Sequence, residues 1–319
     1  MMQVIINGLS YALPLLIIGI GGIYSERSGV TNLALEGLLG FGAFTGGLFV
    51  AFTGGFLVAG SGVQFYASFA AAALGGALFA LLHALLCIKL RANQVISGVV
   101  INIAAMALTG FLTVQINDMA FGQASNKFSL FTAPRYSVPF LKDIPVLGGF
   151  FTDVYPFEPL ILVLTVVFWF ILYRTRFGLH LRACGDNPQA VDAAGVNVAR
   201  VRLLAVMISG LLSGIGGMCF AYSISTNVSP AIYFGAGYLA IAAMIFGNWK
   251  IVPTLGACLI FGFARSAAQQ LVLFLKVDSS VTDLAMAVPY LLVLILLVFF
   301  SKSNRPPKAL GTIYDKGER

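Results

Sequence analysis

The sequence has 319 residues, of which 59% are hydrophobic and only 10% are charged, and its mean hydropathy is +0.94. A soluble domain carries about 25% charged residues, so this composition excludes a soluble globular protein and indicates a chain solvated by lipid. The net charge of +7 does not by itself indicate a nucleic-acid partner, and we expect none. In membrane proteins, basic residues collect on the cytoplasmic side.

Long apolar runs recur along the whole chain, and many reach about 20 residues, the length at which a helix spans the bilayer core. A transmembrane barrel would instead show segments of about 10 residues with alternating polarity. The N-terminal run has no basic residues before it, which favours a first span over a cleaved signal peptide. In chain order, the predicted helices cover residues 5–23, 31–53, 63–88, 95–115, 158–173, 201–224, 235–247, 251–275 and 283–301.

The predicted fold class is therefore all-α, a polytopic membrane protein with about eight or nine transmembrane helices. The segment at 235–247 is too short to span alone, which indicates a broken or re-entrant helix. The helices before and after 158–173 form two halves that this connecting span would invert relative to each other. Each half has a glycine-punctuated stretch, "SGVTNLALEGLLGFGAFTGG" and "GAGYLAIAAMIFGNW". Inverted repeats with broken helices are common in transporters, but small residues also simply permit close helix packing.

The basic residues between the predicted helices fall into two alternating sets, and the larger set marks the cytoplasmic side by the positive-inside rule. This assignment places the N-terminus outside. It divides the chain into a single transmembrane domain, 1–301, and a cytoplasmic tail, 302–319. Within the domain, 116–157 is predicted to be an external loop and 175–200 a cytoplasmic loop.

The polar stretch "DNPQAVDAAG" in the second of these loops predicts a two-turn helix. Asn187 or Asp186 can cap its first amides, and Pro188 suits the first helical position, where an N–H would have no partner. Gly195 supplies the left-handed residue that ends a helix. Because so short a helix is unstable alone in water, we expect it to pack on its own span ends or to dock into another protein.

Three stretches, "SERSGVTNLALEG", "FGLHLRACGDNPQAVDAAGVNVARVRL" and "GAGYLAIAAMIFGNW", resemble the permease subunits of bacterial ABC importers. They are similar to the branched-chain amino acid, ribose and simple-sugar group, and above all to its nucleoside branch. The resemblance covers at least residues 20–275. It implies that the short polar helix is a coupling helix, seated in a groove of a separate ATPase subunit. The residues implied in this coupling are Asp186, Asn187, Pro188, Gln189, Ala190, Asp192 and Gly195.

The resemblance also implies a function, the import of a nucleoside-type solute across the bacterial cytoplasmic (inner) membrane. The implied partners are ABC ATPase subunits, a related permease in a heterodimer or homodimer, and an external solute-binding lipoprotein or periplasmic protein. The chain has no G-x-x-x-x-G-K-[ST] phosphate-binding loop, so we expect no enzymatic activity, catalytic residue, cofactor or metal here. Riboflavin, simple sugars and branched-chain amino acids are alternative solutes. An ion-coupled secondary transporter and a membrane scaffold are alternative classes.

Polar residues at membrane depth are costly and are therefore candidates for the substrate pathway. Glu36 lies about six residues into its predicted span, roughly 9 Å deep, and Asn32 is one turn earlier on the same helical face. Together they could hydrogen-bond ribose hydroxyls or base edges. Alternatively, Glu36 could only fix packing by pairing with Arg27 or with another helix, and an ion pair with Arg265 is one hypothesis. The candidate pathway residues are Asn32, Glu36, Asn102, Arg265 and Gln269.

Overall fold

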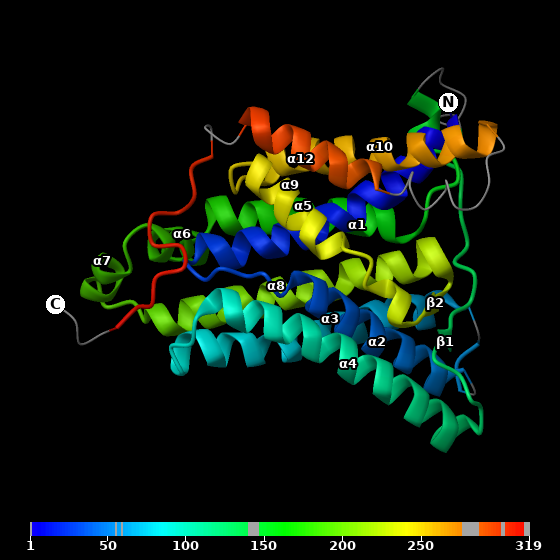
Figure 1. Cartoon of the computed structure of the whole chain (residues 1–319), viewed down its shortest axis with the longest axis horizontal. Helices are drawn as coiled ribbons and strands as arrows, with labels where there is room; N and C mark the ends of the chain where they lie inside the picture. The colour runs from blue at the N-terminus through cyan, green and yellow to red at the C-terminus, as the bar shows by residue number, and fades with distance from the viewer. Residues whose placement is uncertain are drawn as a thin grey trace.

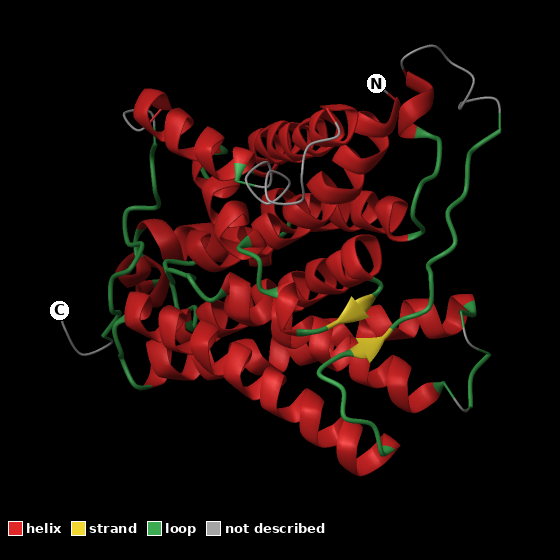
Figure 2. Cartoon of the chain, turned by 45° about the vertical axis from the view of Figure 1, so that its right-hand side comes forward, coloured by secondary structure: helices red, strands yellow, loops and turns green. Residues whose placement is uncertain are grey.

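A computed structural model of the chain describes residues 2–54, 56–58, 60–139, 147–275, 287–300 and 304–315. Within these residues the secondary structure is almost entirely helical, as predicted. Two short strands, β1 (Phe128–Ser129) and β2 (Asn227–Val228), pair in antiparallel register (Figure 2). They lie at one end of the molecule (Figure 1). The all-α fold class is confirmed.

The long apolar helices are α1 (Met2–Arg27), α2 (Leu35–Thr53), α3 (Gly62–Ala84), α4 (Gln94–Phe121), α5 (Phe157–Arg174), α8 (Val198–Phe220) and α10 (Ile251–Leu275). Two of them continue into π-helical turns, α3 into η1 (Leu85–Lys89) and α8 into η3 (Ala221–Ser225). The shorter helices are α6 (Arg176–Asp186), α7 (Pro188–Ala193), α9 (Ala236–Phe246), α12 (Val288–Phe300) and the 3-10 turns η2 (Leu147–Phe150) and η4 (Pro230–Ile232). In the described part of the chain, seven helical segments are long and apolar enough to cross a membrane.

The observed helices match the predicted spans closely, with three corrections. Residues 31–34 are not helical, so α2 begins at Leu35. Helix α4 runs on to Phe121, so the connection predicted to begin at residue 116 begins later. The polar loop contains a second, unpredicted helix, α6, whose first turn is capped by the Thr175 hydroxyl. Of the last predicted span, residues 283–286 and 301 lie outside the described residues.

The centre of the molecule is formed by α1, α2 and α8, which pack against α3 and α10. Glycines allow the closest of these contacts. A Cβ placed on Gly76 of α3 would collide with the carbonyl oxygen of Gly210 in α8, and the reverse also holds. Small residues that let two helix backbones approach are typical of membrane proteins. At this crossing the glycines therefore serve packing, as one of the two interpretations of the sequence expects.

Two helices begin inside the molecule instead of at its ends. A non-helical stretch, residues 28–34, leads from the end of α1 into the interior, where α2 begins. Residues 226–235 lead inward from the opposite end, and α9 begins there. The two helices then run in opposite directions, α2 towards β1 and β2, and α9 towards α6 (Figure 1). That the two halves form an inverted repeat stays a prediction. Helices α2 and α9, called the broken helices below, begin within the two glycine-punctuated stretches of the sequence.

The described connections that carry the larger set of basic residues lie at one end of the molecule. This end, called the basic end below, bears α6, α7 and the segment Asn304–Asp315 (Figure 1). The opposite end bears β1, β2 and the connection from α4 to α5. The structure thus separates the two sets of connections as alternating spans require.

Candidate functional site

Helix α9 begins at the carboxylate of Glu36. Its oxygens accept hydrogen bonds from the backbone N–H groups of Gly235, at 2.7 Å, and Gly237, at 2.6 Å. The first amides of a helix have no partner within the helix, and the N-terminal end of its dipole favours a negative charge. Gly235 has a φ of +88°, and a Cβ on Gly237 would collide with the backbone of Glu36. Glu36 therefore holds the start of α9 directly against the start of α2.

Helix α2 begins at the side-chain amide of Asn102, which comes from α4. The Asn102 Oδ1 accepts from the Gly37 N–H at 2.7 Å, and its Nδ2 donates to the Leu33 carbonyl and to the Tyr238 hydroxyl. Because Tyr238 belongs to α9, Asn102 touches both broken helices. Both N–H groups of the Asn102 amide and its oxygen are thus bound within the protein.

The Asn32 side chain has a similar local role. Its Oδ1 accepts from the Ala34 N–H at 3.0 Å, and its Nδ2 donates to the Ser209 hydroxyl of α8 at 2.9 Å. The predicted pairing of Asn32 and Glu36 on one helical face is wrong, because Asn32 precedes the helix and Glu36 lies in its first turn. Asn32, Glu36 and Asn102 are buried and hold the starts of the broken helices.

Arg265 of α10 lies elsewhere, against α1. Its Nη1 donates to the Tyr11 hydroxyl at 3.1 Å, and its guanidinium lies 4.3 Å from the Tyr11 ring centroid and 5.3 Å from that of Phe234. No ion pair joins it to Glu36, whose carboxylate binds amides instead. The hypothesis of an ion pair between these two residues is therefore wrong. Stacking on electron-rich rings is what stabilises this buried cation.

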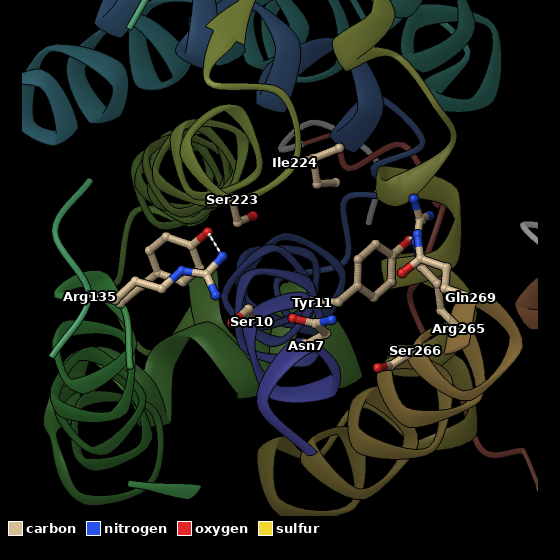
Figure 3. A pocket seen from close by; sticks show the side chains of 10 residues that line it. Asn7, Ser10, Tyr11, Arg135, Ser223, Ile224, Arg265, Ser266 and Gln269 are labelled. Atoms are coloured by element: carbon tan, nitrogen blue, oxygen red, sulfur yellow. Dashed lines mark hydrogen bonds between the residues drawn. The ribbon is translucent and has the colours of Figure 1, made fainter. Parts of the chain in front are cut away.

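A polar pocket of about 310 Å³ opens beside Arg265 (Figure 3). It lies towards the end of the molecule where α1 begins, opposite α7 (Figure 1). Its walls come from the first turns of α1, the connection before α5, the turn η3 and the last turns of α10. In Figure 3, Tyr11, Arg265 and Gln269 lie on one side and Arg135 on the other. The lining residues are Asn7, Ser10, Tyr11, Arg135, Tyr155, Ser223, Ile224, Arg265, Ser266 and Gln269.

The charge of this pocket comes from two arginines, each stacked on a tyrosine. Arg135 lies over Tyr155, 4.3 Å from the ring centroid, and donates to its hydroxyl, while Arg265 is held in the same way by Tyr11. None of the described residues that line the pocket is acidic. The volume falls in the lower part of the range of small-molecule sites, about 300–1,000 Å³. A neutral or anionic polar solute fits this environment, and a cation does not.

The pocket includes two of the five predicted pathway residues, Arg265 and Gln269, and several that the sequence reasoning missed. Asn7, Ser10 and Tyr11 lie on α1, which was read only as an apolar span. They are three and four residues apart and so share one face of a helix, a signal that could have identified them. Nothing in the sequence indicates that Arg135 lies opposite Arg265.

At the basic end, α7 has the capping that the sequence predicts. The Asn187 Oδ1 accepts from the Ala190 N–H at 3.1 Å, Pro188 is the first helical residue, and Gly195 has a φ of +79°. Asp186 is not the cap, because it is the last residue of α6. Pro188 and Val191 are buried against the protein. The exposed face carries Gln189 and Ala190.

Comparisons with known proteins point to one family. The family model described as "Branched-chain amino acid transport system / permease component" matches residues 4–297. The chain is 41% identical to the guanosine ABC transporter permease protein NupQ of Bacillus subtilis, over 98% of this chain and 96% of that protein. It is 37% identical to the nucleoside ABC transporter permease protein NupC of Lactococcus lactis, over 99% and 98% of the two chains. It is 34% identical to the putative glucose ABC transporter permease protein TsgC13 of Haloferax volcanii, over 79% and 72%.

The family match spans nearly all of the described helices, including both broken helices and α7. A permease component has to cross a membrane, and the described residues contain seven apolar helices of membrane-spanning length. The chain therefore belongs to the branched-chain amino acid transport system permease family of ABC transporters.

Proposed function

We propose that this chain is the membrane-spanning subunit of an ABC importer for nucleosides in a bacterial cytoplasmic membrane. The relatives at 41% and 37% identity are named for guanosine and nucleoside transport and align over almost their whole length. The chain would form the passage, together with a related permease as heterodimer or homodimer. Separate ATPase subunits would hydrolyse ATP, and an external solute-binding protein would deliver the solute.

The observation that carries the solute class is the polar pocket between α1, η3 and α10. A nucleoside offers hydroxyls and base edges that donate and accept hydrogen bonds and carries no net charge. The pocket offers the amides of Asn7 and Gln269, the hydroxyl of Ser266, and the Arg265 guanidinium, whereas the Ser10 hydroxyl is bound to Glu158. A pocket with these groups and without a described acidic residue supports the passage of a neutral polar solute.

The positive-inside rule supports placing the basic end, with Asn304–Asp315, in the cytoplasm. The polar pocket would then face outward, where a binding protein releases solute. The segment Asp186–Gly195 would present Gln189 and Ala190 to the ATPase on the inner side. The connection 122–156 would form the outer surface.

The test is uptake of radiolabelled guanosine into cells that carry this chain together with its partner subunits. Arg265→Ala is expected to lower the initial uptake rate at least tenfold, because it removes the group that orders one wall of the pocket. Arg265→Lys keeps the charge but loses the planar stacking, so an intermediate rate is expected. Lys127→Ala removes an exposed positive charge at the same end of the molecule and should leave uptake unchanged.

Uptake that survives loss of the ATPase but stops on collapse of the proton gradient would contradict the proposal and indicate an ion-coupled transporter. Competition by unlabelled riboflavin, simple sugars or branched-chain amino acids, and none by unlabelled nucleosides, would contradict the solute class alone.

A further inference from the structure

The segment Asn304–Asp315, called the strap below, crosses the basic end and is bound to it along its length. The Ala309 N–H donates to the Gly185 carbonyl of α6 at 2.8 Å. At the far end, Asp315 forms a two-pronged ion pair with Arg91, with distances of 2.5 and 2.8 Å. The ends of a domain tend to be poorly ordered unless contacts hold them, and this segment is held by specific contacts.

The strap lies directly against α7. An open polar pocket of about 310 Å³ lies between Asn187, Pro188 and Gln189, at the start of α7, and Lys308, Thr312 and Ile313 of the strap. The Tyr314 hydroxyl also hydrogen-bonds with Asp192 of α7. Here α7 and the strap therefore form one continuous surface.

The strap also contacts the connections that adjoin the two broken helices. The Gly311 N–H donates to the Gly29 carbonyl at 3.1 Å, in the stretch that leads into α2. The Arg305 N–H donates to the Asn248 Oδ1 at 2.8 Å, in the corner that follows α9. Thus a single short segment connects α7 with both broken helices.

Arg202, at the start of α8, reinforces one of these links. Its side chain is buried, and it donates from Nε to the Ser28 carbonyl at 3.1 Å and from Nη1 to the Thr312 carbonyl at 3.2 Å. Its guanidinium lies 6.0 Å from the Tyr314 ring centroid. A buried cation that binds carbonyls of both segments fixes the strap to the stretch before α2.

The size of α7 shows why the strap matters for docking. A stable protein interface buries about 800 Å² on each partner and involves about 20–30 residues per side. Helix α7 has 6 residues, of which Pro188 and Val191 face the protein. The neighbouring strap adds exposed groups of two kinds, the apolar side chain of Ile313, which is 51% exposed, and the ammonium group of Lys308. Apolar contacts with a polar rim are typical of protein interfaces.

We propose that α7 and the strap together form the docking surface for the ATPase subunit, and that the strap transmits movements of α7 to both broken helices. This inference rests on the proposed function, because it requires an ATPase partner. Its complement on the ATPase is an apolar depression for Ile313 beside acidic groups for Lys308.

The first test is co-purification of a co-expressed ABC ATPase subunit with the affinity-tagged permease in detergent. Ile313→Asp is expected to lower the recovered ATPase at least tenfold, and Ile313→Leu should keep it near the wild-type amount. Because Ile313 is exposed, neither variant should disturb the permease. Truncation after Pro306 removes most of the strap and should have the same effect as Ile313→Asp, whereas truncation after Asp315 should have none. Elution in gel filtration checks that each permease is folded.

The second test is cross-linking from introduced cysteines. Lys308→Cys and Gln189→Cys should both cross-link to the ATPase, and Lys127→Cys at the opposite end should not. All four native cysteines are buried. Burial also raises the pKa of the Cys184 thiol, the nearest of them in sequence to α7, to about 11, so that little reactive thiolate forms near neutral pH.

The outcomes separate the two proposals. If Gln189→Cys cross-links but Lys308→Cys does not, or if Ile313→Asp retains the ATPase fully, the composite surface is wrong and the importer assignment stands. If wild-type permease retains no ATPase and neither cysteine cross-links, both proposals are overturned.

Discussion

The starts of α2 and α9 pose the same physical problem and are held by different chemistry. Both helices begin in the interior, where water does not reach their first N–H groups. At α2 the partner is a neutral amide, Asn102 Oδ1, whereas at α9 it is a carboxylate, Glu36, that binds two amides. A carboxylate bound to N–H groups forms hydrogen bonds about twice as strong as neutral ones. We therefore expect the start of α9 to depend more strongly on Glu36 than the start of α2 depends on Asn102.

The two starts are also joined in one network. Asn102 binds the Gly37 N–H next to Glu36 in α2, and it binds the Tyr238 hydroxyl in α9. The elements involved, α4, α2 and α9, come from both predicted halves of the chain. A disturbance of one start is therefore expected to reach the other, which makes the comparison testable by substitution.

The largest effect is expected from Glu36→Ala. It leaves the Gly235 and Gly237 N–H groups without a partner, and each buried unsatisfied group costs about 1–3 kcal/mol. The unfolding midpoint of the purified protein in detergent should fall clearly, together with guanosine uptake. Glu36→Gln keeps one acceptor oxygen and should lose about half as much stability. Equal stability of Glu36→Ala and wild type would show that the carboxylate does not hold α9.

The depth of Glu36 illustrates what the sequence can and cannot predict. Hydropathy locates the second span correctly, because an apolar run of that length has to be solvated by lipid. It does not show where within the run the helix begins, so the sequence predicts residues 31–34 as helical, whereas they are not helical. The prediction places Glu36 about six residues into a helix of which it is the second residue, and it gives Asn32 a helical face that Asn32 does not have.

The sequence predicts α7 well and the polar pocket poorly, because the first depends on neighbouring residues and the second on residues far apart in the chain. The cap, the first-turn proline and the final glycine of α7 lie within ten residues, and local chemistry alone predicts them. The pocket instead depends on contacts such as Tyr11 with Arg265, which are 254 positions apart in the chain. Such pairs follow from how the helices pack, and the sequence therefore predicted Arg265 and Gln269 as polar but not the residues that face them.

An intermediate effect is expected from Asn102→Ala. It leaves one buried N–H, that of Gly37, without a partner, at a cost of about 1–3 kcal/mol, whereas Glu36→Ala leaves two. It also removes the donor for Leu33 and Tyr238, bonds with a net value of about 0.5–1.5 kcal/mol each. The unfolding midpoint should fall less than in Glu36→Ala. Asn102→Asp keeps the acceptor at Gly37 and loses the donor to Leu33 and Tyr238, and so separates the bond to the first turn of α2 from the other two. A larger loss in Asn102→Ala than in Glu36→Ala would reverse the proposed ranking of the two starts.

The smallest effect is expected from Tyr238→Phe, which removes one hydroxyl from the network and leaves both helix starts with their principal partners. The loss should be about 0.5–1.5 kcal/mol, the net value of one neutral hydrogen bond. Tyr233→Phe is the matched control, because it removes a hydroxyl bound to Thr109, just before α9 and outside the Asn102 contacts. If Asn102 couples the starts, combining Tyr238→Phe with Asn102→Ala should cost less than the sum of the two single changes, whereas Tyr233→Phe should add fully. Full additivity of Tyr238→Phe as well would mean that α2 and α9 are capped independently, each by its own residue.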